Sequence, residues 1–506
     1  MVIPLLCIVL AYFLLLLLVA YRTSRHSNNE SFFIGNRSSN WMLVAFGMIG
    51  TSLSGVTFIS VPGTVGAFGE RGLKAFTYFQ VVIGYLLGYF VVAFVLLPLY
   101  YRMKLTSIYR YLDQRLGIVS YKTGALFFII SRTVGATARL YLVINVLQLF
   151  LLDSLGVSFV WTTVIILGMI LLYTLEGGVK TIVWTDTLQT TFMLLGLITA
   201  VVYILGHLHI DLGTAWEGFK AKGFTRVLDT NVQDKGFFVK QILGGAFITI
   251  AMTGLDQEMM QKNISVHRVG DAQKNMVTFS LIMVAVNALF LFLGGLLYLY
   301  AFSQGATVTD HVLTLGAKHV AGDDLFPSLA LHYFSPAISL IFIIGLISAL
   351  FPSADGALTA LTSSFCIDLL GLQQRTDLDE KRKKRIRMTV HGCFALVFLL
   401  CILTFREIND KSIINIILDL AGYTYGPLLG LFAFGILTRR TLKYQRWVPV
   451  VCLVSPVLCY LLSRYSGAWL GGYKIGIELL IINGLLTFIG LFLLSEKVVR
   501  KKKTYE

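Results

Sequence analysis

The sequence predicts an all-α integral membrane protein, and three observations lead to this class. Of the 506 residues, 56% are hydrophobic and only 14% are charged, whereas soluble domains contain about 25% charged residues. The mean hydropathy is +0.76, and apolar runs of membrane-spanning length recur from end to end. No strand-like alternation appears, and in lipid only helices and closed barrels satisfy their backbone hydrogen bonds, so we expect helices.

We expect about thirteen transmembrane helices, with ends uncertain by a few residues. Apart from short termini the sequence leaves no room for a soluble domain, so residues 1–506 are expected to form one transmembrane unit. The predicted spans, in order, are 2–21, 41–65, 75–101, 119–152, 159–174, 181–205, 237–254, 276–302, 337–370, 388–405, 413–437, 447–462 and 475–494. The first span lacks a charged leading region and a small-residue cleavage site, so we expect it to be retained.

The charges indicate how these spans are oriented. The formal net charge is +15, and Lys and Arg gather in alternate loops, which is the positive-inside pattern. It predicts a plasma (inner) membrane protein with its N-terminus outside and its C-terminus cytoplasmic. The basic run 381–387 is typical of a topology anchor at an anionic membrane surface. Docking of a partner protein is the other interpretation, but neither nucleic acid nor an obligatory protein partner is expected.

The six cysteines all lie within predicted spans, without a CxxC motif or a neighbouring histidine cluster, and we interpret them as apolar packing residues. We also find no Walker A loop, HExxH motif or nucleophile elbow in a plausible context. The sequence therefore does not indicate an enzyme.

One acidic residue lies inside an apolar helix. The stretch from Glu176 to Gln189 places Asp186 just before the uninterrupted apolar segment 190–205. An ionisable group within a span is costly and usually marks an ion or substrate pathway. Asp186 is therefore the first candidate functional residue.

Two spans are unusually rich in small residues. Residues 46–63 are crowded with Gly, Ser and Thr and end in Pro-Gly, and residues 243–254 contain several Gly and Thr. The two spans are five apart, so five-helix units that start at each would run in opposite directions. Such a pair predicts two broken helices around a binding site in the middle of the membrane. Close helix packing is the alternative explanation for small residues.

The chain resembles the sodium/solute symporter family in several segments that occur in the family's order. They are Ser31–Trp41, Ser54–Gly63, Gly177–Gln189, Asp256–Gln261 and Leu358–Ser364. The resemblance implies a leucine-transporter-type fold with two inverted five-helix repeats whose first and sixth core helices are broken. We expect an extra helix and loop in 1–40, repeats in 41–206 and 237–440, and two final helices with a basic tail in 445–506.

The resemblance also implies a main Na⁺ site. Na⁺ is a hard cation that prefers oxygen ligands. In the family's pattern these are carbonyls of the first core helix, and a small residue with two hydroxyls on the eighth. The matching positions are Gly50, Leu53, Ala349, Pro352 and Ser353. Proline has no hydroxyl, but Pro352 frees the carbonyl of Ser348 from its helical donor. A freed ligand and a plain kink both stay open.

Asp355 is a second departure from the family pattern. Some members have a second Na⁺ site made of serines on the eighth helix and the signature aspartate, and here those positions hold Pro352, Asp355, Gly356 and Asp186. The resemblance places Asp186 and Asp355 close together. Two unpaired carboxylates in a low dielectric do not both stay ionised cheaply. A bound cation, a protonated acid and a structural salt bridge are the three explanations.

Arg132 and Arg139 lie seven residues apart in the fourth span and so on one helical face. An arginine within a span needs an acid, a cavity or a ligand, and its planar fork suits a carboxylate. Pairing with Asp186 or Asp355 is one interpretation, and substrate binding is the other. We expect Arg139 to be the structural one because it lies deeper in the span.

The resemblance to sialic-acid-type members implies a substrate site. The matching positions are Ser54, Thr57, Phe76, Gln80 and Arg132. This set suits a polar sugar acid, with an arginine for the carboxylate, hydroxyls and an amide for the alcohols, and a ring for an apolar face. A second set on the tenth core helix is expected to line the outer side: Asn415, Asp419, Tyr423 and Tyr425.

We therefore expect a Na⁺-coupled symporter that imports a small organic solute, such as sialic acid or a similar sugar acid, by alternating access. A neutral sugar or polyol, an amino acid and a vitamin are the alternative solutes. A transporter-like solute sensor on the same fold is the first rival, since fold does not fix function. A membrane-embedded enzyme that uses Asp186 and Asp355 is the second.

Overall fold

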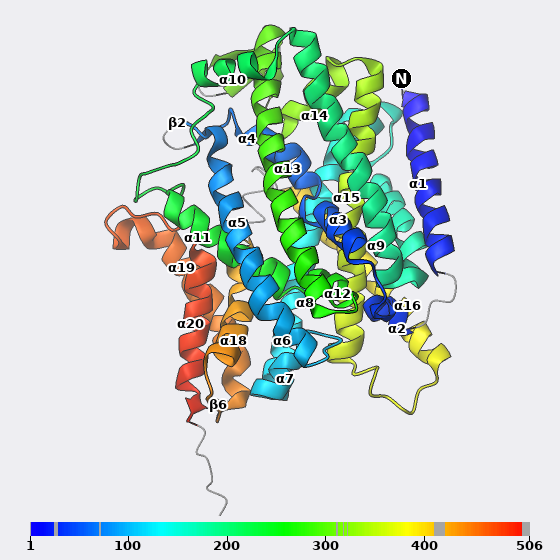
Figure 1. Cartoon of the computed structure of the whole chain (residues 1–506), viewed down its shortest axis with the longest axis vertical. Coiled ribbons are helices and arrows are strands. Elements are labelled where there is room, and N and C mark those ends of the chain that lie inside the picture. The colour runs from blue at the N-terminus through cyan, green and yellow to red at the C-terminus, as the bar shows by residue number, and fades with distance from the viewer. Residues whose placement is uncertain are drawn as a thin grey trace, which may run out of the picture.

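The computed structural model describes residues 2–24, 29–69, 72–309, 312–316, 318–320, 322–408 and 420–497. Long helices stand side by side and form a bundle (Figure 1). Its main helices are α1 (Val2–Ser24), α3 (Trp41–Ser52), α4 (Gly55–Thr64), α5 (Phe79–Val91), α8 (Ile118–Leu147), α9 (Phe159–Leu208), α11 (Phe238–Thr249), α12 (Gln257–Ile264), α13 (Val269–Ser303), α15 (Pro336–Ser364), α16 (Glu380–Ile408), α18 (Gly426–Leu437), α19 (Val448–Trp469) and α20 (Leu479–Leu493).

Short helices connect or extend these: α2 (Asn29–Ile34), α6 (Leu97–Arg102), α7 (Arg110–Leu116), α10 (Leu212–Ala221) and α14 (Gly322–His332). Four π-helical turns continue longer helices: η3 (Val92–Leu96), η4 (Gln148–Leu152), η6 (Ile250–Gly254) and η7 (Phe365–Leu369). The 3-10 turns are η1 (Gly35–Arg37), η2 (Ala75–Tyr78), η5 (Asp153–Leu155) and η8 (Gln445–Trp447).

The predicted helical membrane class is confirmed, while the predicted number of spans stays a prediction. Among the described residues, eight helices are long and apolar enough to cross a membrane, or up to ten if each bent pair is one span. Three shorter apolar helices, Phe159–Leu175, Gly426–Leu437 and Leu479–Leu493, add to these. The first is part of α9, which is interrupted at Gly178 (φ 54°, ψ −148°). A side chain there would overlap Phe32, so glycine allows α2 to pack against α9.

Both small-residue spans are broken, as predicted. The axes of α3 and α4 differ by 56°, and the axis of Phe238–Gly254 differs from that of α12 by 63°. Ser54 lies at the first break with a non-helical backbone (φ −16°, ψ 172°). Asp256 lies at the second, where its side chain accepts hydrogen bonds from the backbone N–H groups of Glu258 and Met259 and so begins α12. Each break leaves backbone groups without helical partners in the interior of the bundle.

Short strands occur in the loops, which the sequence pattern did not predict. They form antiparallel pairs: β1 (Phe68–Gly69) with β2 (Gly72–Leu73), β4 (Val312–Leu315) with both β3 (Thr307–Thr309) and β5 (Lys318–Val320), and β6 (Thr441–Leu442) with β7 (Ser495–Glu496). Strands of this length contain too few residues for a visible alternation of apolar and polar side chains. They lie outside the long helices and leave the helical class unchanged.

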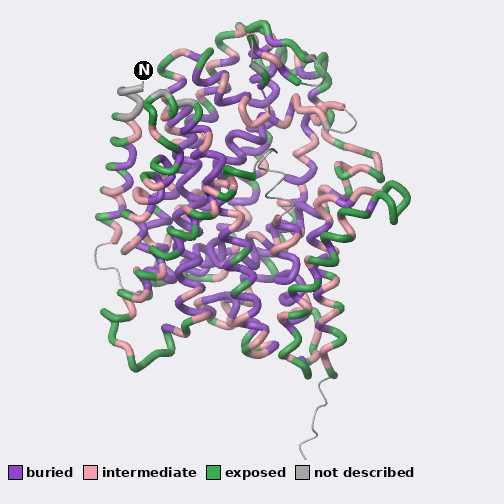
Figure 2. Tube along the Cα trace, turned by 180° about the vertical axis from the view of Figure 1, so that it is seen from behind, coloured by how far each residue is buried: buried purple, intermediate pink, exposed green. Residues whose placement is uncertain are grey.

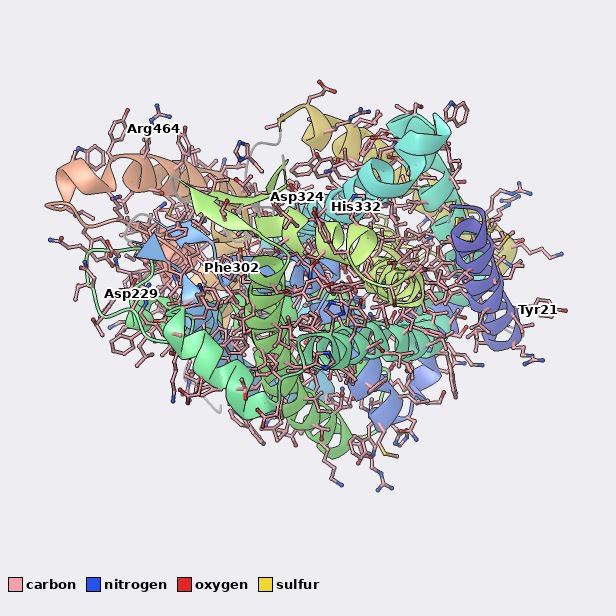
Figure 3. The ribbon with its side chains drawn as sticks, turned by 90° about the horizontal axis from the view of Figure 1, so that it is seen from above. Tyr21, Asp229, Phe302, Asp324, His332 and Arg464 are labelled. Carbon is pink, nitrogen blue, oxygen red and sulfur yellow. The ribbon has the colours of Figure 1, made fainter. Side chains whose placement is uncertain are left out.

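One end of the bundle is covered by the longest loops. Helices α10 and α14 lie at the same end of the molecule as the N-terminus (Figure 1). The Asp211 side chain accepts a hydrogen bond from the Thr214 backbone N–H at the start of α10, and this bond lowers the pKa of Asp211. Seen from this end, α1, marked by Tyr21, and α19, marked by Arg464, stand at opposite edges (Figure 3).

Burial separates the interior of the bundle from its periphery. Buried residues fill the centre, and exposed residues lie on the outer helices and loops (Figure 2). Many exposed side chains on α1 and α19 are large and apolar, such as Leu10, Leu14, Leu453 and Val457. Apolar side chains on the outside and polar ones inside are expected of helices that face lipid.

Candidate functional site

A cavity of about 110 Å³ lies where the two broken helices face each other. Its wall combines the break between α3 and α4, the π-turn before the second break, and residues from η2, α5, α8, α11, α12 and α13. The lining residues are Thr51, Ser52, Leu53, Ser54, Val56, Thr57, Tyr78, Tyr85, Tyr89, Arg132, Arg139, Ile248, Thr249, Met252, Thr253, Met259, Met283 and Asn287. The cavity therefore brings together Ser54, Thr57 and Arg132 from the predicted substrate set.

Arg132 is held by acidic residues from the second break. Its guanidinium donates a hydrogen bond to Glu258 Oε2 and lies 3.8 Å from Asp256 Oδ2. Arg132 and Glu258 are both almost fully buried. Pairing of this kind offsets part of the cost of removing both charges from water, and removal of either partner would leave the other charge buried and uncompensated. Arg132 therefore pairs with Glu258 and Asp256, not with Asp186 or Asp355 as one interpretation of the sequence proposed.

Arg139 lines the same cavity but has a different environment. It makes no ion pair and no hydrogen bond with the described residues of the chain. Its neighbours in the cavity wall include Tyr78, Tyr85, Tyr89 and Asn287. We expected Arg139 to be the structural arginine, and the structure instead gives the acidic partners to Arg132. Arg139 thus lines the cavity without a hydrogen-bond partner in the part of the chain that the structure describes.

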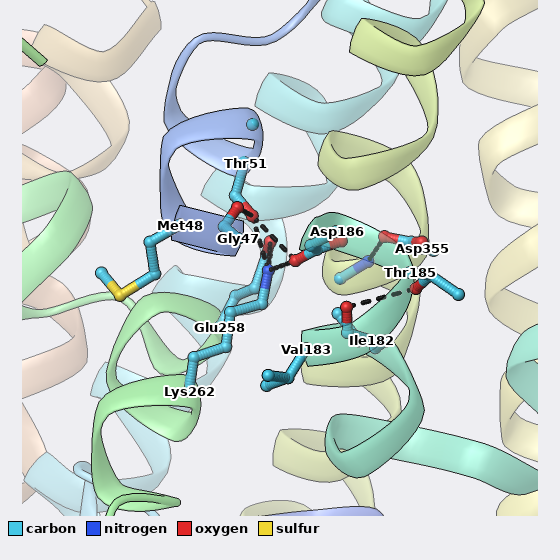
Figure 4. A network of polar contacts seen from close by, with 12 residues as sticks. Gly47, Met48, Thr51, Ile182, Val183, Thr185, Asp186, Glu258, Lys262 and Asp355 are labelled. Carbon is cyan, nitrogen blue, oxygen red and sulfur yellow. Dashed lines mark hydrogen bonds and ion pairs between the residues drawn. The ribbon is translucent and has the colours of Figure 1, made fainter. Parts of the chain in front are cut away.

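Asp186 lies in a buried network beside the first break (Figure 4). Its Oδ2 atom lies 2.7 Å from Lys262 Nζ and accepts a hydrogen bond from Thr51 Oγ1 at 3.1 Å. Lys262 Nζ also donates to Thr51 Oγ1 at 2.7 Å and to Glu258 Oε1 at 3.4 Å. Of the three explanations for this acid, the structure thus contains a salt bridge, and its cation is Lys262.

Asp355 belongs to the neighbouring helix α15 (Figure 4). Its Oδ2 atom accepts a hydrogen bond of 2.8 Å from the Tyr173 hydroxyl, and its Oδ1 atom accepts one of 2.5 Å from the Gly356 N–H. In the described part of the chain no basic side chain lies within 4 Å of Asp355. Tyr12 of α1 approaches the same helix and is hydrogen bonded by Ser348 Oγ at 2.9 Å.

The predicted main Na⁺ site lies between α3, α9 and α15. The break ends α3 at Ser52. Among the described backbone hydrogen bonds, Ser54 N–H does not donate to the Gly50 carbonyl, and Thr57 N–H does not donate to the Leu53 carbonyl. Those two carbonyls are the predicted ligands. A side chain at Gly50 would lie 3.5 Å from Pro352 Cγ, so α3 and α15 approach closely here. Ala349 and Ser353 are buried on α15, and the Ser353 hydroxyl donates to the Leu350 carbonyl at 3.0 Å.

Phe76 and Gln80 face a loop instead of the cavity. Phe76 packs against Trp216 and Phe219 of α10. The Gln80 amide donates to the carbonyls of Thr77 and Gly236, and its oxygen accepts the Asp229 N–H at 3.1 Å. Neither residue lines the cavity described above. The structure therefore separates these two from Ser54, Thr57 and Arg132.

Of the four candidates on the tenth core helix, the structure describes Tyr423 and Tyr425. Asn415 and Asp419 lie outside the described residues. The Tyr425 hydroxyl donates to Asp256 Oδ2 at 3.0 Å, so this buried side chain supports the second break. Tyr423 packs against Tyr460 of α19.

Sequence reasoning missed Glu258 and Lys262, which hold Arg132 and Asp186. The predicted seventh span ended at residue 254, and the residues that follow, Asp256–Gln261, were matched to the end of the sixth core helix without a role for Glu258 or Lys262. The available signal was a pair of opposite charges four residues apart directly after a Gly-rich apolar segment. Such a pair lies on one face of a helix. Tyr173 was also missed, because an isolated tyrosine in an apolar span gives no signal of its own.

Comparison with known proteins places the chain in a family. The sodium:solute symporter family matches residues 32–444. Human sodium-coupled monocarboxylate transporter 1 is 26% identical over 430 residues, which is 83% of this chain and 66% of that protein. The sodium/sialic acid symporter NanT of Aliivibrio fischeri is 22% identical over 460 residues, or 87% and 84% of the two chains. The sodium-dependent multivitamin transporter of Oryctolagus cuniculus is 25% identical, and this chain spans 61% of its length.

Solved structures agree on the fold. A Na⁺-coupled sialic acid symporter in a substrate-bound outward-open state superposes with a TM-score of 0.81 at 18% identity, over 98% of this chain and 99% of that one. Mhp1, a nucleobase-cation-symport-1 family transporter, gives 0.53 at 12% identity over 90% and 92% of the two chains. This chain spans about two thirds of the length of the monocarboxylate transporter. Because the family match covers most of the sequence, the chain belongs to the sodium:solute symporter family, which comprises Na⁺-coupled membrane transporters and not enzymes.

Proposed function

We propose that this protein is a secondary-active symporter that imports a small carboxylate-bearing solute together with Na⁺ by alternating access. One observation supports the solute class most strongly. Arg139 lies in the wall of the cavity between the two helix breaks and has no acidic partner among the described residues. A guanidinium within a membrane span is costly unless it meets an anion or water. A carboxylate on the solute supplies that anion.

Arg139 suits a carboxylate because its planar fork donates two parallel hydrogen bonds. Arg132 contributes by fixing the cavity wall, since Glu258 and Asp256 already engage its charge. Ser54 and Thr57 line the cavity at the first break, and we propose that their hydroxyls contact the polar groups of the solute. We propose that Phe76 and Gln80 act indirectly. Phe76 packs against α10 and Gln80 is hydrogen bonded to residues 229 and 236, so both fix the loop that follows α9.

Two relatives suggest the range of solutes. One is a monocarboxylate transporter and another a sialic acid symporter, and both solutes contain a carboxylate. Sialic acid or a similar sugar acid remains our specific proposal, because the cavity wall offers hydroxyl groups as well as a guanidinium. A simple monocarboxylate is the second candidate, and Arg139 serves both.

For Na⁺ we propose the site formed by the carbonyls of Gly50 and Leu53 with Ala349 and Ser353. The helix break that exposes the solute cavity also frees these carbonyls, so binding of ion and solute would affect the same segment. Asp355 lies beside this site without a basic side chain within 4 Å among the described residues, and we propose that its negative charge favours the presence of Na⁺ there, whereas Lys262 already pairs with Asp186.

We propose that the N-terminus faces the outside of the plasma (inner) membrane and the C-terminus the cytoplasm. In support, the end of the bundle that includes the N-terminus also holds α10 and α14 (Figure 1), and the basic run 381–387 lies at the start of α16. We also propose that residues 41–206 and 237–440 form the two inverted repeats, each beginning with one of the broken helices.

Uptake in proteoliposomes tests this function. Purified protein is reconstituted, and uptake of labelled sialic acid, lactate, glucose, inositol and proline is compared under inward gradients of Na⁺ and of choline. We expect Na⁺-stimulated uptake of sialic acid, of lactate or of both, and none of the neutral solutes. Absence of Na⁺-stimulated uptake of every solute contradicts the symporter, and uptake of a neutral solute alone contradicts the role given to Arg139.

A further inference from the structure

Lys262 is a buried lysine whose ammonium is fully engaged. Its three N–H donors meet Asp186 Oδ2 at 2.7 Å, Thr51 Oγ1 at 2.7 Å and Glu258 Oε1 at 3.4 Å. The side chain is only 3% exposed. The acceptors come from α9, α3 and α12, so the ammonium joins the first helix break to the segment after the second (Figure 4).

The groups around this ammonium are the ligand types that a hard monovalent cation prefers. They are two carboxylate oxygens and one hydroxyl oxygen. The other oxygen of Asp186, Oδ1, is buried and has no hydrogen-bond partner among the described residues. Asp186 is thus a buried anion that depends on the Lys262 charge, and an unpaired buried charge is strongly unfavourable.

The formal charges near the two breaks show what the ammonium contributes. Four buried carboxylates lie here, on Asp186, Asp256, Glu258 and Asp355. The described cations around them are Arg132, Arg139 and Lys262. One carboxylate is in excess, which one added monovalent cation neutralises. Without the ammonium two carboxylates would be in excess, and a second cation would be needed.

We propose that Lys262 is a resident cation that takes the place of a mobile one at Asp186, so that this chain binds one Na⁺ fewer than the same scaffold without the ammonium. Thr51, Asp186 and Glu258 then form a latent Na⁺ site. If the chain is a symporter, as proposed above, one bound Na⁺ fewer also means one Na⁺ fewer moved with each solute molecule. This consequence for coupling rests on the proposed function.

Direct binding of ²²Na⁺ to the purified full chain, with no solute present, tests this inference. Lys262→Met keeps an unbranched side chain of nearly the same length but lacks the terminal ammonium, which leaves space beside Asp186. We expect this variant to bind about one Na⁺ more per chain at saturation than the unchanged protein. Lys262→Arg retains the positive charge and Lys220→Met removes a lysine from the exposed helix α10, and both should bind the unchanged number.

A second variant covers the risk that Lys262→Met is unstable with an unpaired Asp186. Lys262→Met with Asp186→Asn removes both charges and is expected to bind the same number of Na⁺ ions as the unchanged protein. An equal number in Lys262→Met overturns the inference. It is also overturned if that variant fails to accumulate even in high Na⁺ while the double variant accumulates, since no cation then replaces the ammonium.

The result of this binding experiment can be distinguished from the result of the uptake experiment that tests the proposed function. Na⁺-driven uptake by the unchanged protein, with no additional Na⁺ bound by Lys262→Met, overturns the inference alone. An additional Na⁺ bound by that variant, without Na⁺-driven uptake of any solute by the unchanged protein, contradicts the proposed function alone.

Discussion

Arg132 of α8 and Glu258 of α12 form a buried ion pair in the wall of the cavity between the two helix breaks. Arg139 lies two turns further along α8, lines the same cavity and has no ion pair with the described residues. The two arginines share one helical face and the same chemistry, yet among the described residues only Arg132 has an acidic partner within 4 Å. Under the proposed function, Arg132 is structural and Arg139 binds the carboxylate of the solute.

Replacing Arg139 should weaken solute binding more than folding. A hydrogen bond to a charged group contributes about 1.5–3 kcal/mol, so Arg139→Gln is expected to raise the KM for a carboxylate solute by about 10- to 100-fold. The melting temperature should change little, because no carboxylate among the described residues is paired with Arg139. Arg464→Gln, on the exposed part of α19, is the matched control. An unchanged KM in Arg139→Gln would contradict the proposed carboxylate contact.

Replacing Arg132 should have the opposite profile. Arg132→Gln leaves Glu258 and Asp256 buried with weaker compensation, and removing one partner of a buried pair costs about 3–5 kcal/mol. We expect a large drop in melting temperature and in the yield of folded protein, measured by thermal denaturation in detergent. The change should be partly relieved by adding Glu258→Gln. A variant of normal stability with impaired solute affinity alone would favour direct solute binding by Arg132, as the sequence suggested.

The Tyr173 hydroxyl should matter through Asp355. Tyr173→Phe removes the donor at 2.8 Å from Asp355 Oδ2 and leaves a buried acceptor less satisfied, at a cost of about 1–3 kcal/mol. We expect a lower melting temperature in choline and a larger increase on adding Na⁺ than in the unchanged protein, because the cation then offsets more of the charge. Tyr465→Phe, an exposed tyrosine of α19, serves as control. Equal Na⁺ effects in Tyr173→Phe and the control would count against a cation near Asp355.

A methyl group at Gly50 should disturb the proposed Na⁺ site. In Gly50→Ala the added carbon would overlap the Thr190 hydroxyl and contact Pro352, so the Thr190 side chain or α3 must shift at a cost of about 1–3 kcal/mol. The Na⁺ concentration for half-maximal uptake should increase. Gly135→Ala on α8 is the control, since nothing lies within 4 Å of the added carbon, and it should preserve Na⁺ dependence. Normal Na⁺ dependence in Gly50→Ala would place the ion elsewhere.

Replacing Gln80 should loosen the loop to which its side chain is hydrogen bonded. Gln80→Leu removes its hydrogen bonds to Gly236 and Asp229, so we expect faster amide exchange in residues 226–236, measured by mass spectrometry. The KM for solute should change by no more than about threefold, because Gln80 does not line the cavity. Such a change corresponds to less than about 0.7 kcal/mol of binding free energy. A KM raised more than tenfold with unchanged exchange would return Gln80 to the solute site.

Much of the fold followed from local composition. The apolar runs predicted a helical bundle, and the clusters of Gly, Ser and Thr at residues 46–63 and 243–254 predicted both breaks. The short helix α12 lay outside the predicted seventh span because its eight residues include few apolar ones, and only the family resemblance marked Asp256–Gln261 as the end of a core helix. Its burial comes from packing between longer helices, which hydropathy along the chain does not measure.

The sequence by itself determined that Asp186, Asp355, Arg132 and Arg139 lie within membrane spans, because each interrupts an apolar run. Only the tertiary structure decided which of these charges the protein neutralises internally. Asp186 meets Lys262, which is 76 residues away along the chain, and Arg132 meets Glu258, while Arg139 faces the cavity. The physical reason is that the cost of a buried charge depends on the distance and geometry of its counterion. Those are set by how the two broken helices pack together and not by residues adjacent in sequence.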